Sequence, residues 1–219
     1  MSSRPPSAGM TLYTYFRSSA AFRARIALNL KGLKPEQVFV HLRKKEQSAE
    51  QYRKLNPQAL IPTLVHDGQA IGQSLAIIEY LDEIVPEPPF LPADPPGRAH
   101  VRQIAYAVAC DIHPLGNMRV LNYLRDTLGH SEAEVLAWQQ NWIARGFAAI
   151  ETMVARAPSR FCHGDRPTLA DICLIPQMAN ARRAELDLAP YPTLLRIEKA
   201  AFELPAFVDA LPKNQPDAE

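Results

Sequence analysis

A proline-rich stretch divides this chain into two parts with different hydrophobic patterns. Prolines are dense in the segments 86–89 and 92–97. A proline has no amide hydrogen to donate, so such segments cannot continue a helix or lie inside a sheet. We therefore expect one domain over residues 10–90, a linker over 91–97 and a second domain over 98–219.

The part before the prolines alternates between strand-like and helix-like patterns. The expected elements are a strand over 11–16, a helix over 20–30, a strand over 37–42, a helix over 49–55, strands over 62–66 and 70–71, and a helix over 74–84. Asp67-Gly68 is a typical turn between the last two strands. The order β-α-β-α-β-β-α predicts an α/β thioredoxin-like domain.

The part after the prolines predicts helices alone. Their expected ranges are 99–110, 115–128, 131–155, 169–184 and 194–202. Thr168 and Asp171 form a capping box at the start of one of them, which is a structural role. Residues 1–9 are rich in Ser and Pro, and we expect them to be a disordered extension.

Composition excludes several classes of function. The 219 residues carry 24 Lys and Arg against 23 Asp and Glu, so the net charge of +1 gives no basis for nucleic-acid binding as the main role. No apolar run is long enough for a transmembrane helix. Cys110, Cys162 and Cys173 are far apart, which is typical of reduced, buried cysteines in a cytoplasmic protein. Cys162-His163 and Cys173 lack a fourth ligand at usable spacing, so we expect no metal site.

Two hydroxyls and several arginines mark the junction between the first strand and the first helix. Ser18 and Ser19 precede the helix, and Arg17 and Arg23 flank them. The first amides of a helix are unpaired and lie at the positive end of its dipole, so this junction suits an anion such as a thiolate. A serine pair that only caps the helix is the structural alternative.

Two further segments suggest a peptide ligand. Ile61-Pro62 precedes a strand, where a cis proline would leave the Ile61 backbone available to an extended ligand; a trans proline beginning an edge strand is the alternative. Ser74, as N-cap of the next helix, and Gln73 offer donors to a carboxylate. A thiol site, a backbone clamp and a carboxylate site together fit glutathione.

At these segments the sequence resembles the zeta-class glutathione transferases, the maleylacetoacetate and maleylpyruvate isomerases. The resemblance is carried by 17–23, 55–64, 73–81, 110–117, 180–183 and 190–192, and it covers nearly everything after Thr11. The first and fourth segments are more specific to the zeta class. The Ile-Pro and Gln-Ser pairs occur across the wider transferase superfamily.

The resemblance implies a set of site residues. Ser18 and Ser19 would support the glutathione thiolate, and Ser18 would be the activating hydroxyl. Arg183 would bind a substrate carboxylate, with Arg17 as the second candidate. The residues implied to contact glutathione are Ser18, Ser19, Arg23, Gln47, Ile61, Pro62, Gln73, Ser74, His113, Asn117 and Arg119. His113 as a simple helix cap, and Arg182 with Arg183 as an exposed basic pair, are the structural alternatives.

The resemblance further implies a glutathione-dependent cis-trans isomerase that converts a maleyl diketoacid to its fumaryl isomer. It also implies a homodimer, a small dicarboxylate-like substrate, and no nucleic-acid or membrane partner. A transferase that conjugates electrophiles, and a non-catalytic module of the same fold, are the rival functions. Ala20 and Ala21 stand where the family usually has Cys and Ser, so side activities that need that cysteine do not carry over. Maleylacetoacetate and maleylpyruvate are not separated by the sequence.

Overall fold

The computed structural model describes residues 8–219, so most of the predicted extension over 1–9 lies outside the described residues. The chain forms two compact units. The first contains the residues up to Pro89 together with Leu204–Glu219, and the second is Phe90–Glu203. The helical domain expected over 98–219 therefore ends earlier, because Leu204–Glu219 packs with the first unit.

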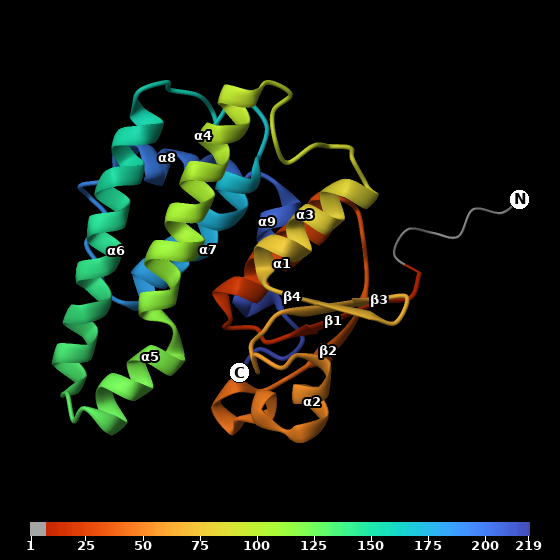
Figure 1. Cartoon of the computed structure of the whole chain (residues 1–219). Coiled ribbons are helices and arrows are strands. Elements are labelled where there is room, and N and C mark those ends of the chain that lie inside the picture. Colours follow the sequence, from red (N-terminus) through yellow and green to blue (C-terminus); the bar gives the residue numbers. More distant parts are fainter. Residues whose placement is uncertain (1–7) are drawn as a thin grey trace, which may run out of the picture. The chain divides into compact units, whose positions relative to one another are not determined.

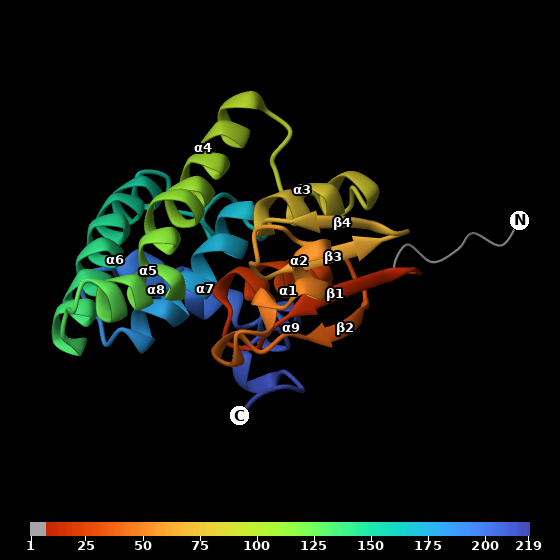
Figure 2. The same ribbon diagram turned by 60° about the horizontal axis from the view of Figure 1, so that its bottom comes forward.

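The first unit is built on a four-stranded sheet with the order β2-β1-β3-β4 (Figures 1 and 2). The strands are β1 (Met10–Thr14), β2 (Glu36–Phe39), β3 (Thr63–His66) and β4 (Gln69–Gly72). β2 is parallel to β1, and β3 is antiparallel to both β1 and β4. Asp67 and Gly68 both have positive φ, 49° and 81°, as the predicted two-residue hairpin requires.

Helices cover both faces of this sheet. They are α1 (Ser19–Leu30), α2 (Glu50–Leu55) and α3 (Ser74–Ile84), and the short 3₁₀ helices η1 (Leu42–Lys44) and η2 (Glu46–Ser48) precede α2. Figure 1 shows α1 and α3 together on one face and α2 on the other. Leu12, Ile26, Leu64 and Ile77 are buried in the core between the sheet and the helix pair. The short helix α9 (Pro205–Val208) packs against α1. The predicted α/β thioredoxin-like domain is confirmed.

The second unit contains helices and turns, and its described residues form no strand, as expected. Its elements are α4 (Pro95–Tyr106), η3 (Ala107–Ile112), η4 (His113–Gly116), α5 (Met118–Asn122), η5 (Tyr123–Thr127), α6 (Glu132–Ala155), α7 (Leu169–Arg183) and α8 (Pro192–Ala201). α7 is buried along most of its length and packs against α4 and α8. Gly146 lets α6 approach η3 closely, because a Cβ at this position would lie 2.2 Å from Ile112 Cδ1.

Two predictions for this unit were wrong in detail. The single helix expected over 115–128 is interrupted, because Pro114 sits in η4 and Asn117 has an extended backbone, ψ 143°, before α5 begins. Of the three cysteines, Cys162 and Cys173 are buried but Cys110 is exposed. Within residues 8–219, no helix combines the length and the apolar character needed to cross a membrane.

Asp171 fixes the start of the central helix α7. Its carboxylate accepts from the Thr168 amide at 2.8 Å and from the Cys162 amide at 2.8 Å, so it joins the helix to the preceding loop. The side chain is fully buried, and this burial raises its pKa although both amides oppose the rise. The predicted capping role of Asp171 is confirmed.

Asp171→Ala should lower the free energy of unfolding by about 2 to 4 kcal/mol, because two buried amides lose their acceptor. Urea denaturation followed by circular dichroism would measure the loss. Asp165→Ala is the control, since Asp165 is exposed in the same loop and its removal should change stability by less than about 0.5 kcal/mol. Equal effects of the two variants would contradict the capping role.

Candidate active site

The sheet register brings the predicted site segments of the first unit to one end of the sheet. Tyr13 near the end of β1 pairs with Thr63 at the start of β3, and Thr63 pairs with Gly72 at the end of β4. The chain leaves β1 toward α1, enters β3 from Pro62, and leaves β4 toward α3. Two helix N-termini and one proline loop therefore lie at the same end of the sheet, where β1 and β4 end and β3 begins.

Ser18 is the N-cap of α1, which begins at Ser19, one residue before the expected helix over 20–30. It has an extended backbone, and its Oγ accepts from the Ala21 amide at 3.2 Å. Because the hydroxyl accepts from the protein, its own hydrogen remains to donate to a ligand. The side chain is partly exposed, whereas Ser19, the first residue of α1, is buried. This geometry makes Ser18 the better placed of the two hydroxyls.

The arginines around the serines differ sharply in exposure. Arg17 is exposed, which suits the predicted role in binding a substrate carboxylate. Arg23 is only 2% exposed, and its Nη1 donates to Ser74 Oγ at 3.3 Å, which joins α1 to α3. Arg23 thus helps to bring the thiol and carboxylate ends of the candidate site together from inside the unit.

The peptide bond between Ile61 and Pro62 is cis, so the trans alternative is wrong. Within the described residues, the Ile61 amide and carbonyl make no hydrogen bond to the protein. The backbone of Ile61 is therefore able to pair with an extended peptide in the antiparallel manner. Both residues are buried side chains of the loop that enters β3.

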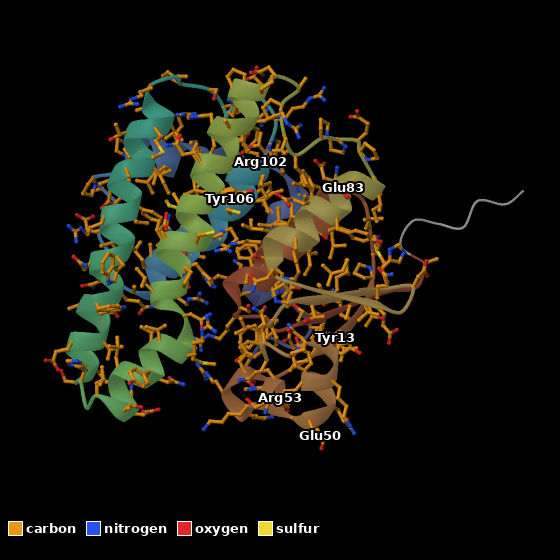
Figure 3. All side chains as sticks on the ribbon, in the orientation of Figure 1. Tyr13, Glu50, Arg53, Glu83, Arg102 and Tyr106 are labelled. Atoms are coloured by element: carbon orange, nitrogen blue, oxygen red, sulfur yellow. The ribbon has the colours of Figure 1, made fainter. Side chains whose placement is uncertain are left out.

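A network of side chains holds this loop. Asn56 Nδ2 donates to the Leu60 carbonyl and to Thr63 Oγ1, each at 2.9 Å, and the Tyr52 hydroxyl donates to the same carbonyl at 2.7 Å. Burial raises the pKa of Tyr52. Tyr52 also lies 5.9 Å from the ring of Tyr13, which is on the α2 face of the sheet (Figure 3). The residues on both sides of Ile61-Pro62 are thus fixed from beneath.

The second helix terminus differs from the prediction in its cap. The N-cap of α3 is Gln73, whose φ is 66°, and Ser74 is the first helical residue. Ser74 is buried and its Oγ accepts from Arg23, so its hydrogen remains for a ligand carboxylate, as at Ser18. Gln73 is exposed, and its Nε2 donates to Gln58 Oε1 at 2.7 Å. Positive φ is costly for a non-glycine residue, and such strain is typical of functional sites.

Gln47 lies in η2, after β2. Since β2 is parallel to β1, the chain leaves β2 at the same end of the sheet at which the other predicted residues lie. The Gln47 Oε1 atom is buried, and it has no hydrogen-bond partner among the described residues. Its predicted contact with glutathione stays a prediction.

The other predicted residues lie in the second unit. His113 begins η4, and Asn117 is the N-cap of α5, where its Oδ1 accepts from the Arg119 amide at 3.1 Å. Arg119 is exposed. The structure thus gives Asn117 a capping role, and the glutathione contacts implied for the three residues remain predictions.

The two arginines at the end of α7 have different partners. Arg182 forms an ion pair with Glu198 of α8, which is 6% exposed. Arg183 is exposed and hydrogen-bonds the side chain of Asn180. Both arginines are exposed, but Arg182 is held in an ion pair, so Arg183 is the better candidate for a substrate carboxylate.

Sequence reasoning missed two groups that shape this site. Asn56 entered the sequence analysis only as a member of the segment 55–64. The one sign of its supporting role was an Asn directly before a proline. Arg25 is 3% exposed, and its guanidinium donates to Thr14 Oγ1 and to the Tyr15, Phe16 and Ala210 carbonyls. Burial lowers its pKa to about 10, so it remains charged at neutral pH. An arginine on the otherwise apolar face of α1 was the available signal.

Family models match both units. The model for the glutathione S-transferase N-terminal domain matches residues 8–83, and the model for the glutathione S-transferase C-terminal domain matches residues 133–208. Together these matches cover more than half of the chain. The first spans every predicted site residue of the first unit, and the second includes Arg183.

Individual relatives match nearly the whole chain. A maleylpyruvate isomerase from a Ralstonia species is 48% identical over 95% of this chain and 100% of its own. A holo structure of a zeta-class bacterial maleylpyruvate isomerase has a TM-score of 0.94, at 48% identity over 95% of this chain and 100% of its own. A maleylacetoacetate isomerase from Anaeromyxobacter dehalogenans, with dicarboxyethyl glutathione and citrate bound in its active site, has a TM-score of 0.85, at 45% identity over 96% of this chain and 99% of its own.

Asn56→Ala should lower the free energy of unfolding by about 1 to 3 kcal/mol and weaken binding to immobilised glutathione, because the loop that presents Ile61 loses its support. Denaturation and retention on a glutathione resin would measure the two effects. Asn122→Ala, in α5, is the control and should change neither. An Asn56→Ala variant that loses stability but retains normal glutathione binding would contradict the link between this network and the ligand.

Proposed function

Because the chain belongs to the zeta class of the glutathione S-transferase family, we propose that it is a glutathione-dependent cis-trans isomerase of a maleyl diketoacid. The substrate is maleylacetoacetate or maleylpyruvate, and the product is the fumaryl isomer. The proposal is carried by three features that lie at one end of the sheet. They are a capped helix N-terminus at Ser18, an unpaired Ile61 backbone and a second helix N-terminus at Ser74.

The residues at this end of the sheet fit glutathione as the cofactor. A thiolate at Ser18 receives the hydroxyl hydrogen that the Ala21 bond leaves available. The Ile61 backbone pairs with the central peptide of the ligand. The amides at the start of α3, with the hydroxyl of Ser74, bind its carboxylate. Gln73 and Gln47 supply further donors, and Arg23 holds Ser74 in place.

Ser18 lowers the pKa of the bound thiol without acting as a base. A hydrogen bond to a charged acceptor contributes about 1.5 to 3 kcal/mol, and a helix N-terminus about 0.3 to 1. One pKa unit corresponds to about 1.36 kcal/mol, so the two effects suffice for a depression of roughly one to two units. A free thiol, with a pKa of about 8.5 and only a few per cent ionised at pH 7, is then about one quarter to three quarters ionised at that pH.

When bound, glutathione would supply a nucleophilic thiolate for reversible addition to the cis double bond; addition would make that bond single and free to rotate, and loss of the same thiolate would restore the double bond. Arg183 and Arg17 bind the substrate carboxylates, since a guanidinium is always charged and its fork matches two oxygens. The Anaeromyxobacter relative binds a dicarboxyethyl glutathione, which supports a site for glutathione and carboxylates side by side.

An assay with purified protein tests this function. Maleylacetoacetate and maleylpyruvate would be supplied separately with glutathione, and the fumaryl product and the free thiol would both be measured. Isomerisation should proceed with no net loss of thiol. Thiol loss in step with substrate would favour the rival conjugating transferase. Failure to retain the protein on immobilised glutathione would favour a non-catalytic module.

We also propose a homodimer in the cytoplasm. Large apolar side chains are exposed in the second unit, at Tyr106 (39%), Met118 (36%), Tyr123 (57%) and Leu128 (54%), and a subunit interface would cover them. Tyr106 is labelled on α4 in Figure 3. The three free cysteines support a reducing compartment. Sedimentation at micromolar concentration distinguishes the dimer from a monomer.

Ser18→Ala should raise the pKa of bound glutathione by roughly one to two units, because the thiolate loses a charge-assisted hydrogen bond while the helix dipole remains. Isomerase activity should fall at neutral pH and recover partly in alkaline buffer. Ultraviolet titration of the bound thiolate measures the shift, with Ser19→Ala as the comparison. A shift in Ser19→Ala alone would transfer the role to Ser19, and no shift in either variant would refute activation by a hydroxyl.

Arg183→Ala should reduce kcat/KM for the substrate roughly 10- to 100-fold, because about 1.5 to 3 kcal/mol of charge-assisted bonding is lost. Glutathione binding should stay near that of the wild type. Arg182→Ala is the matched control, since it removes the same charge from the adjacent position but breaks the ion pair with Glu198, so it should lower stability and spare kcat/KM. The reverse pattern would exchange the roles of the two arginines.

A further inference from the structure

The C-terminal segment of the chain is bound to the loop that carries Ser18. This segment, Leu204–Glu219, belongs to the first compact unit. Asp217 Oδ2 accepts from the Phe16 amide at 2.9 Å, and Glu219 Oε1 lies 2.7 Å from His41 Nε2. Asp217 and Phe16 are 201 positions apart in the chain. Neither carboxylate takes part in the function proposed above.

The loop that Asp217 contacts is a tight turn over residues 15–18. The Ser18 amide donates to the Tyr15 carbonyl at 3.0 Å, which closes the turn and leaves the Phe16 amide without a bond inside it. Arg25 donates to the carbonyls of Tyr15 and Phe16, at 3.4 and 3.1 Å. Asp217 supplies the remaining acceptor, so the turn is held by a cation on its carbonyls and an anion on its amide.

Phe16 lies two residues before Ser18. The hydrogen bond from the Phe16 amide to Asp217 therefore fixes the direction in which the backbone reaches Ser18 and the start of α1. We infer that Asp217 is a positioning residue for the thiol-activating hydroxyl, and this inference rests on the function proposed above. Hydrogen bonds to a reacting group need placement within about 0.5 Å, which a loop achieves only when its own polar groups are satisfied. A Phe16 amide without its acceptor lets the turn relax and weakens the bond from Ser18 to the thiolate.

A role of Asp217 through its charge and a role through positioning predict opposite shifts in the pKa of the glutathione thiol. If Asp217 acted only through its charge, its removal would take an anion away from the thiolate and lower the thiol pKa. If it acts by positioning, removal of the acceptor raises the thiol pKa, because Ser18 is displaced. The sign of the shift therefore separates the two effects, and a purely structural role in stability would move the thiol pKa in neither direction.

The test compares Asp217→Ala with Asp217→Asn by ultraviolet titration of bound glutathione. Asparagine keeps an oxygen that accepts from the Phe16 amide but has no charge. Asp217→Ala should raise the thiol pKa by about half a unit to one unit, and Asp217→Asn should stay near the wild type. Glu219→Gln is the control in the same segment and should cause no shift. Activity of Asp217→Ala should recover in alkaline buffer.

Several results would overturn the inference. An unchanged thiol pKa in Asp217→Ala, a lowered one, or equal shifts in the Ala and Asn variants would each do so. If Asp217→Ala does not fold, a chain ending at Gln215 replaces it, because Gln215 still bonds the Asp209 and Leu211 carbonyls and closes the segment. The readout needs only bound glutathione: a wild type that binds none overturns the proposed function as well, whereas a normal wild type with unshifted variants overturns the positioning role alone.

Discussion

The buried guanidinium of Arg25 is the interaction on which the candidate site depends. It reaches the side chain of Thr14 at the end of β1, the carbonyls of the turn that follows, and the Ala210 carbonyl of the C-terminal segment. A buried charge is tolerated only when its donors are satisfied, and here most acceptors are backbone carbonyls of irregular chain. The sheet, the first helix and the C-terminal segment are therefore joined at the turn that precedes Ser18.

Much of this arrangement was predictable because its signals are local. Ser18 before an apolar helical pattern, Ile61-Pro62 before a strand and the Asp67-Gly68 turn each follow from backbone preferences of the residues themselves. The order of the elements then determined the α/β domain, and the sheet register places Ser18 and Ile61 at one end of the sheet. Family resemblance supplied what local physics does not, namely the ligand and the substrate.

The remaining features come from contacts between residues that are distant in sequence. Nothing near Asp217 indicates that its carboxylate accepts from Phe16, so the C-terminal segment was assigned to the wrong unit. The cap of α3 was misplaced by one residue because Gln73 adopts a positive φ that its residue type disfavours. The helix expected over 115–128 breaks at Asn117, where a capping side chain outweighs a continuous helical pattern.

Ser18 and Ser74, at the two ends of the candidate ligand site, share one hydrogen-bonding arrangement. Ser18 Oγ accepts from the Ala21 amide, and Ser74 Oγ accepts from Arg23, so in both cases a protein donor occupies the oxygen and the hydroxyl hydrogen points elsewhere. A hydroxyl held in this way donates to an anion and is poorly disposed to accept a proton from a thiol. In the function proposed above, Ser18 would therefore stabilise a thiolate after ionisation, and the proton would leave to solvent. The same reasoning makes Ser74 the proposed donor to a carboxylate, so that one ligand with an anion at each end would satisfy both helix termini at once.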